Sequence, residues 1–105
     1  MNFDARRPNT SLDHLWRDYR EGPAWSRVGH YREWAELVEN IADPARVERR
    51  GTELMNQGYS IHFHVWDHPA LLEFFVNVQR NLPLPLELEL SVKHRAEIIN
   101  ILRKT

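Results

Sequence analysis

The chain has 105 residues, of which 42% are hydrophobic and 28% charged, and its formal net charge is −1. This length predicts one domain with a modest core, because a chain of this size buries about two thirds of its unfolded surface on folding. The charge balance excludes the basic excess of nucleic-acid-binding domains. No apolar run approaches the ~20 residues that span a bilayer, and the N-terminus lacks the apolar core of a signal peptide. We therefore expect a soluble, cytoplasmic protein without a nucleic-acid or membrane partner.

Residue counts also exclude several kinds of chemistry. The chain has no cysteine, which excludes disulfides, thiolate zinc sites and cysteine nucleophiles. Its four glycines are widely separated and form neither G-x-G-x-x-G nor the P-loop pattern. The chain therefore lacks an ordinary phosphate or dinucleotide cradle.

The N-terminal half carries the periodicity of helices, with apolar residues recurring on one helical face. Gly22-Pro23 ends the first run, and Asp43-Pro44 is a cap followed by proline at the first helical position. After an extended lead-in over 1–9, helices are expected from a cap at Thr10 or Ser11 to Gly22, over about 24–41, and over 44–57.

The C-terminal half changes character at Tyr59–Trp66, which is rich in β-branched and aromatic residues and is predicted to be a strand. Asp67 then caps a helix with a broad apolar face. Leucines at 86, 88 and 90 alternate with glutamates, which predicts a strand with one buried face. Lys93-His94-Arg95 is the expected turn. The last strand, Glu97–Arg103, is apolar on both faces except at Asn100 and requires cover on both sides.

This order predicts an α+β fold: three N-terminal helices, then strand-helix-strand-strand with a small, mostly antiparallel sheet. We expect a single domain over 1–105. It would consist of the lead-in (1–9), a helical part (10–58) and a strand-helix-hairpin part (59–105).

Four segments together carry a family resemblance. F-D-x-x-R-P-x-T-x-x-x-H-L-x-x-D-Y runs from Phe3 to Tyr19, and H-Y-R-E-W from His30 to Trp34. Y-S-I-H-F-H-V-W occupies Tyr59–Trp66, and L-R-K closes the chain at Leu102–Lys104. Over about residues 3–104 the chain resembles the C-terminal part of a family of bacterial class I S-adenosylmethionine-dependent methyltransferase-like proteins.

The resemblance implies that the cofactor-binding half is absent. Residues 10–58 would be a helical insertion on the substrate side, and 67–104 the last helix and closing hairpin of the methyltransferase sheet. This chain alone would hold no cofactor and would not be catalytic, whereas an intact relative would bind S-adenosylmethionine. The hairpin turn departs from the family, which often has Asn-Gly where this chain has His94-Arg95. The substrate contacts implied by the matching motifs are Arg7, His30, Tyr31, His62, His64 and Trp66.

Two other functions stay open. The first is a small, non-enzymatic binding domain that dimerises through its last strands. In that case its partner would be a second copy of the chain and not the missing cofactor-binding half. The second is a small metal-binding protein with His62, His64 and His68 as ligands. On a strand, residues i and i+2 share a face, and histidine is the commonest protein metal ligand. The competing structural interpretation places these histidines on the polar face of a half-buried strand.

Overall fold

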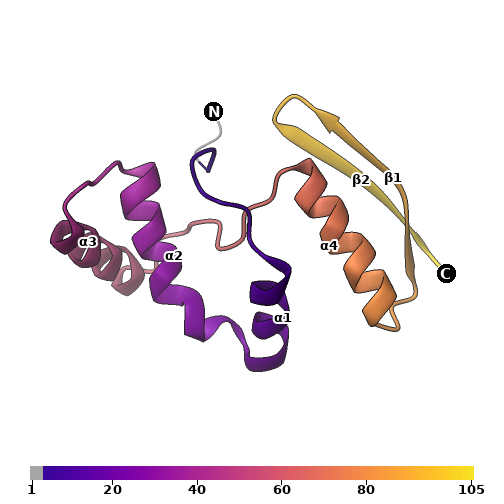
Figure 1. Ribbon diagram of the computed structural model, residues 1–105, viewed down its shortest axis with the longest axis horizontal. Helices are drawn as coiled ribbons and strands as arrows, with labels where there is room; N and C mark the ends of the chain where they lie inside the picture. The colour runs from indigo at the N-terminus through magenta and orange to yellow at the C-terminus, as the bar shows by residue number, and fades with distance from the viewer. Residues whose placement is uncertain (1–3) are drawn as a thin grey trace. The chain divides into compact units, whose positions relative to one another are not determined.

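The computed structural model describes residues 4–105 and contains helices followed by an antiparallel hairpin (Figure 1). Phe3 of the first motif lies outside the described residues. The predicted α+β class is confirmed. The chain forms two compact units, one ending at Val65 and one comprising Trp66–Thr105. The elements are α1 (Leu12–Glu21), a 3-10 turn (Pro23–Ser26), α2 (Arg27–Glu33), a π-helical turn (Trp34–Val38), α3 (Pro44–Asn56), α4 (His68–Asn81), β1 (Leu86–His94) and β2 (Glu97–Lys104).

Local capping explains where α1 and α3 begin. The Ser11 side chain accepts a hydrogen bond from the His14 amide (3.1 Å), and Asp43 accepts one from the Arg46 amide (3.3 Å). Such caps satisfy amides that have no partner inside the helix. Gly22, with a φ of 84°, follows α1 in a conformation that favours glycine. The predicted boundaries of these two helices are therefore confirmed to within about two residues.

The helix predicted over 24–41 is not continuous. A 3-10 turn precedes α2, and a π-helical turn follows it. In that wider turn the amide of Glu39 donates to the carbonyl of Trp34, five residues back (3.1 Å). The helix then ends before Asn40, whose φ is 59°. The prediction of one helix was wrong because an apolar stripe reports which face is buried and does not resolve a single wider turn.

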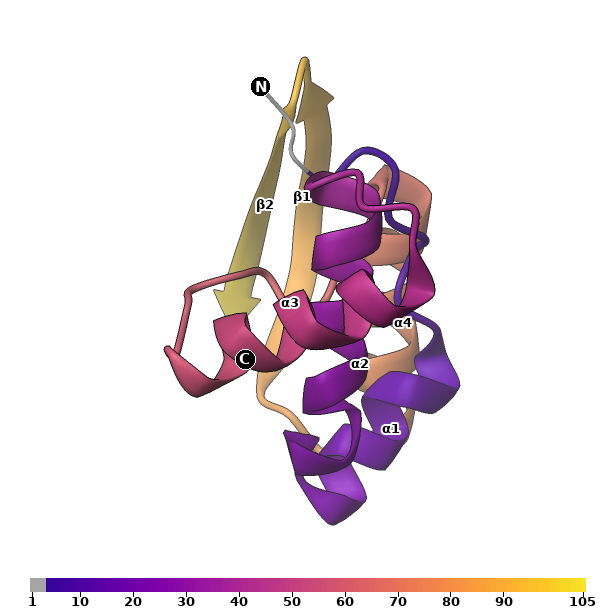
Figure 2. The same cartoon turned by 90° about the vertical axis from the view of Figure 1, so that its left-hand side faces the viewer.

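The core of the first unit lies between α2 and α3, which cross in Figure 2. Tyr31, Ala35 and Leu54 are buried there. Gly51 permits the close approach of the two helices, since a Cβ at this position would lie 3.2 Å from the amide nitrogen of Arg32 and 3.3 Å from its Cα. The missing side chain is therefore required by packing rather than by backbone conformation.

We expect Gly51→Leu to lower the free energy of unfolding by about 2 kcal/mol, because the added side chain meets backbone that cannot rotate away. Gly29→Ala is the matched variant in α2, where an added Cβ would meet nothing within 4 Å. It should stabilise the protein by about 0.5–1 kcal/mol through helix propensity. Urea denaturation would measure both; equal effects of the same sign would contradict this account of the helix packing.

The segment Tyr59–Trp66 is not a strand, and that prediction was wrong. Its backbone instead forms hydrogen bonds with α3 and with the residue before the cap of α1. The amide of Tyr59 donates to the carbonyl of Leu54 (3.0 Å), and the carbonyl of Val65 accepts from the amide of Thr10 (2.7 Å). The amide of Val65 donates to Thr10 Oγ1 (2.9 Å). A strand requires a ladder with a neighbouring strand, and in residues 4–105 none lies beside this segment.

The second unit consists of α4 and the hairpin. Asp67 caps α4 by accepting a hydrogen bond from the Ala70 amide (2.9 Å), as predicted. His94 still pairs with Glu97, so the turn is Arg95-Ala96 rather than Lys93-His94-Arg95. Arg95 has a φ of 56°, a conformation that two-residue hairpin turns demand and that glycine adopts most easily.

The two faces of the hairpin differ. On one face Ser91 pairs with Asn100, and the Ser91 Oγ lies 2.8 Å from Nε2 of His68 in α4. The predicted single buried face of leucines is wrong, because a bulge between Leu88 and Leu90 interrupts the alternation. The opposite face carries four apolar side chains, each 41–48% exposed: Leu90, Val92, Ile99 and Ile101. We call these four residues the open hairpin face.

Candidate functional site: a histidine cluster

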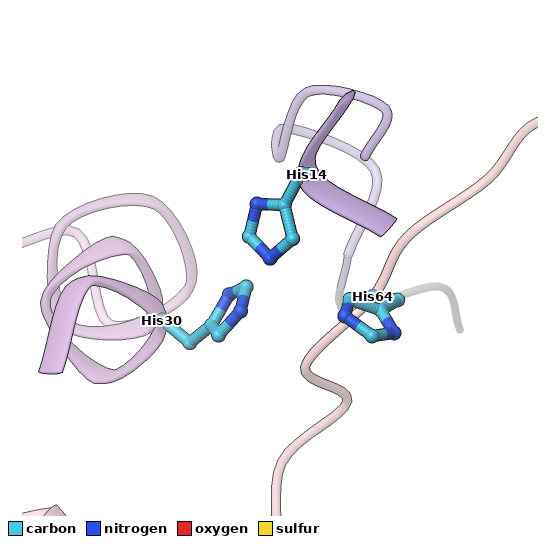
Figure 3. Close-up of side chains that lie close together, drawn as sticks. All are labelled: His14, His30 and His64. Carbon is cyan, nitrogen blue, oxygen red and sulfur yellow. The ribbon is translucent and has the colours of Figure 1, made fainter. Parts of the chain in front are cut away.

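Three histidines from separate parts of the first unit gather at one place (Figure 3). His14 lies in the first turn of α1, His30 lies in α2, and His64 lies in the segment after α3. Their potential ligand nitrogens are all within 4.8 Å of one another. The ring centroids are 5.0 Å apart for His14 and His30, and 5.4 Å apart for His14 and His64.

Backbone structure brings these side chains together. The Ser11 cap begins α1 and thereby places His14 in its first turn. Thr10 lies just before that helix and forms two hydrogen bonds with Val65, the residue that follows His64. These bonds hold His64 close to the start of α1. His30 is 8% exposed and stacks on Phe63, at 5.5 Å between ring centroids and 12° between planes. The cluster is thus held by contacts among the start of α1, α2 and the segment after α3.

Asp18 adds a carboxylate to the cluster. It follows His14 by one helical turn, which places both side chains on one face of α1. Its Oδ2 lies 2.6 Å from Nε2 of His64 and 3.3 Å from Nε2 of His14. The contact to His14 lacks hydrogen-bond geometry, and Nε2 of His14, Nε2 of His30 and Oδ1 of Asp18 are buried without a hydrogen-bond partner. Buried polar atoms without partners are uncommon in folded proteins.

The protonation of His30 reflects its surroundings. Burial is the largest cause that lowers the pKa of His30 to about 4, followed by the charges of His14, His64 and Arg7. Asp18 acts in the opposite direction without offsetting them. At neutral pH the His30 imidazole is therefore uncharged, which is the form that carries a free nitrogen lone pair.

A second constellation surrounds Arg7, whose side chain is fully buried. Its Nε donates to Glu33 (2.7 Å), and one terminal nitrogen donates to Asp4 (2.7 Å) and to the carbonyl of His62 (2.6 Å). Burial raises the pKa of Asp4, but hydrogen bonds from His62 and Arg7 outweigh this effect and hold the pKa of the carboxyl below its ordinary value. Arg7 thus joins the N-terminal lead-in, α2 and the segment containing His62.

A hollow of about 470 Å³ lies beside this constellation, with Asp4, Trp34, Tyr59 and His62 among its lining residues. The predicted substrate residue His62 thus lines an open cavity in the first unit. His62 is largely exposed there and lies 2.7 Å from Asp4.

The other predicted substrate residues are distributed differently. Arg7, His30 and Tyr31 are buried, and the Tyr31 hydroxyl donates to the carbonyl of Tyr59 (2.7 Å). His64 belongs to the histidine cluster. Trp66 lies in the second unit, where its ring is 5.6 Å from that of Phe74.

The predicted metal ligands His62, His64 and His68 are not brought together as a set. Within residues 4–105 the grouping of three ligand-type side chains is His14, His30 and His64. His62 pairs with Asp4, and His68 contacts Ser91. The expectation assumed a strand over 59–66, and without that strand the i, i+2 rule does not apply. The sequence did contain a signal for His14, the ligand that the prediction missed. His14 and Asp18 are spaced by one helical turn within the first motif, which places an imidazole and a carboxylate on the same face of a helix.

No family model, curated protein or solved structure matches the chain. Across residues 4–105, no helix has both the length and the apolar character needed to cross a membrane.

Proposed function

We propose that this chain is the C-terminal, substrate-side part of a methyltransferase-like protein, and that it completes the sheet of a cofactor-binding half without being catalytic alone. The observation that carries the proposal is the open hairpin face. It accompanies the resemblance of the motifs at Phe3–Tyr19, His30–Trp34 and Tyr59–Trp66 to that family.

The hairpin has the properties of a sheet fragment. Two strands alone are marginally stable in water, and here α4 lies against only one face. The open hairpin face exposes four branched apolar side chains, which favours burial against another layer. Among residues 4–105 the sheet has only β1 and β2, so the outer edge of β2 offers backbone groups to which a further strand could pair.

The glycines support the expectation that this chain alone holds no S-adenosylmethionine. Gly22 and Gly58 have positive φ next to helix ends, and Gly51 packs against α2. None belongs to a loop of closely spaced glycines, the feature that lets backbone amides approach a nucleotide. In the proposed assembly the partner half would hold the cofactor, and the hollow beside His62 would face the methyl acceptor.

A fusion experiment tests this function. The chain would replace the corresponding part of a methyltransferase from the family it resembles, and S-adenosylhomocysteine binding would be measured by calorimetry. We expect the fusion to bind and the isolated chain not to bind. Ile99→Glu in the fusion should weaken binding at least about 10-fold, equivalent to 1.4 kcal/mol, because it places a charge in the interface. Lys93→Glu, also on the hairpin but outside the open face, should not.

Two outcomes would contradict the proposal. One is saturable one-to-one binding of S-adenosylhomocysteine by the isolated chain. The other is a fusion that Ile99→Glu leaves unimpaired. Light scattering of the isolated chain tests the alternative, a homodimer through the open hairpin face: a dimer that Ile99→Glu converts to a monomer would favour it.

A further inference from the structure

We propose that His14, His30 and His64 bind one divalent transition-metal ion, with Asp18 as the fourth ligand and zinc as the metal that fits best. This site goes beyond the proposed function and does not depend on it. It rests on the geometry of the cluster, on its buried polar atoms and on the chemistry of its donor set.

The spacing of the donor atoms is close to that of a metal site. Nitrogen and oxygen ligands in tetrahedral zinc sites lie about 2.0–2.2 Å from the metal, which places them about 3.3–3.6 Å from one another. The histidine nitrogens lie within 4.8 Å of one another. Asp18 Oδ2 lies 3.3 Å from Nε2 of His14, which fits this spacing, and it is hydrogen-bonded to Nε2 of His64 at 2.6 Å, a bond that a metal ion would replace. Small side-chain rotations would bring all four donors around one ion.

The buried atoms without partners point to an occupant. Nε2 of His14, Nε2 of His30 and Oδ1 of Asp18 are all buried without a hydrogen bond. A group of such atoms in one place is expected to surround a water molecule or an ion. A metal ion would satisfy both imidazole nitrogens at once, whereas an empty cluster would leave them unpaired.

The donor set selects the class of metal. Imidazole nitrogens suit zinc, copper, iron and nickel, and the absence of sulfur ligands disfavours Cu(I) and iron–sulfur clusters. Three neutral imidazoles and one carboxylate would carry a net charge of −1, which suits a divalent cation in a buried place. A set of four protein ligands corresponds to the closed coordination of structural zinc sites.

The positions of the ligands indicate what the metal would do. His14 and Asp18 come from α1, His30 from α2, and His64 from the segment after α3. One ion would therefore cross-link three parts of the first unit that are distant in sequence. Binding to a site assembled only in the folded state stabilises that state.

The test uses the full chain without an affinity tag, stripped with a chelator and titrated with Zn²⁺ by calorimetry. We expect one Zn²⁺ per chain. His14→Gln should weaken binding by about 100-fold or more, and Asp18→Asn by about 10-fold. His62→Gln and His68→Gln are matched controls outside the cluster and should retain the affinity of the unmodified chain.

A second measurement guards against variants that fail to fold. Co²⁺ added to the unmodified, metal-free chain should give the visible absorption of a tetrahedral site with nitrogen and oxygen ligands, and Zn²⁺ should remove it. Absence of this spectrum would overturn the proposal, as would one-to-one binding that His14→Gln leaves unchanged. Loss of binding in His62→Gln and His68→Gln, with His14→Gln unaffected, would assign the metal to those residues instead.

Discussion

Arg7→Leu is expected to lower the free energy of unfolding by about 3 kcal/mol, because removal of one partner from a buried ion pair leaves charges without compensation. The guanidinium is fully buried and bonds Asp4, Glu33 and the carbonyl of His62. Leucine would fill part of the volume but satisfy none of these acceptors. Urea denaturation, monitored by tryptophan fluorescence, would measure the decrease in the free energy of unfolding.

Two further variants separate this effect from a general loss of charge. Arg50→Leu removes an arginine whose ion pairs with Glu39 and Glu53 are on the surface, so it should cost far less stability than Arg7→Leu. Arg7→Lys retains the charge but lacks the planar fork of donors, and it should recover only part of the stability. Equal losses for Arg7→Leu and Arg50→Leu would contradict the central role assigned to Arg7.

Leu54→Ala is expected to cost about 3 kcal/mol, within the range for truncation of a buried leucine that leaves a cavity. Leu54 is 1% exposed and is the largest fully buried side chain of the described residues. Val28→Ala, at a 38% exposed position in α2, should change stability by less than about 0.5 kcal/mol. The same urea denaturation would compare them, and similar losses would show that the core does not lie where α2 and α3 meet.

The contacts of Arg7 and the histidine cluster both hold the segment after α3 in place within the first unit. Arg7 bonds the carbonyl of His62, and the histidine cluster includes His64. Together with the bonds between Thr10 and Val65, they hold the segment after α3 against the N-terminal lead-in and α1. Residues expected at a substrate site thus also determine how the first unit is assembled. Activity assays of variants at Arg7 or His64 therefore require parallel measurement of stability.

Some features could be predicted because they depend on residues a few positions apart. Ser11, Asp43 and Asp67 each accept a hydrogen bond from an amide three residues later. Two strand-like segments close together in the sequence, the first alternating and the second apolar on both faces, indicated a hairpin, and the order of helices and strands indicated the α+β class. The periodicity did not reveal the π-helical turn at Trp34–Val38 or the bulge after Leu88, since each shifts the backbone by a single residue.

The sequence by itself determined the starts of α1, α3 and α4, the hairpin and the fold class, because caps and periodicity are local. Only the tertiary structure decided the state of Tyr59–Trp66, whose composition favours a strand but whose backbone bonds go to Thr10 and Leu54. It also decided the grouping of His14, His30 and His64. Such choices depend on which distant segments meet, and a side chain's type and spacing carry no information about partners beyond its own element.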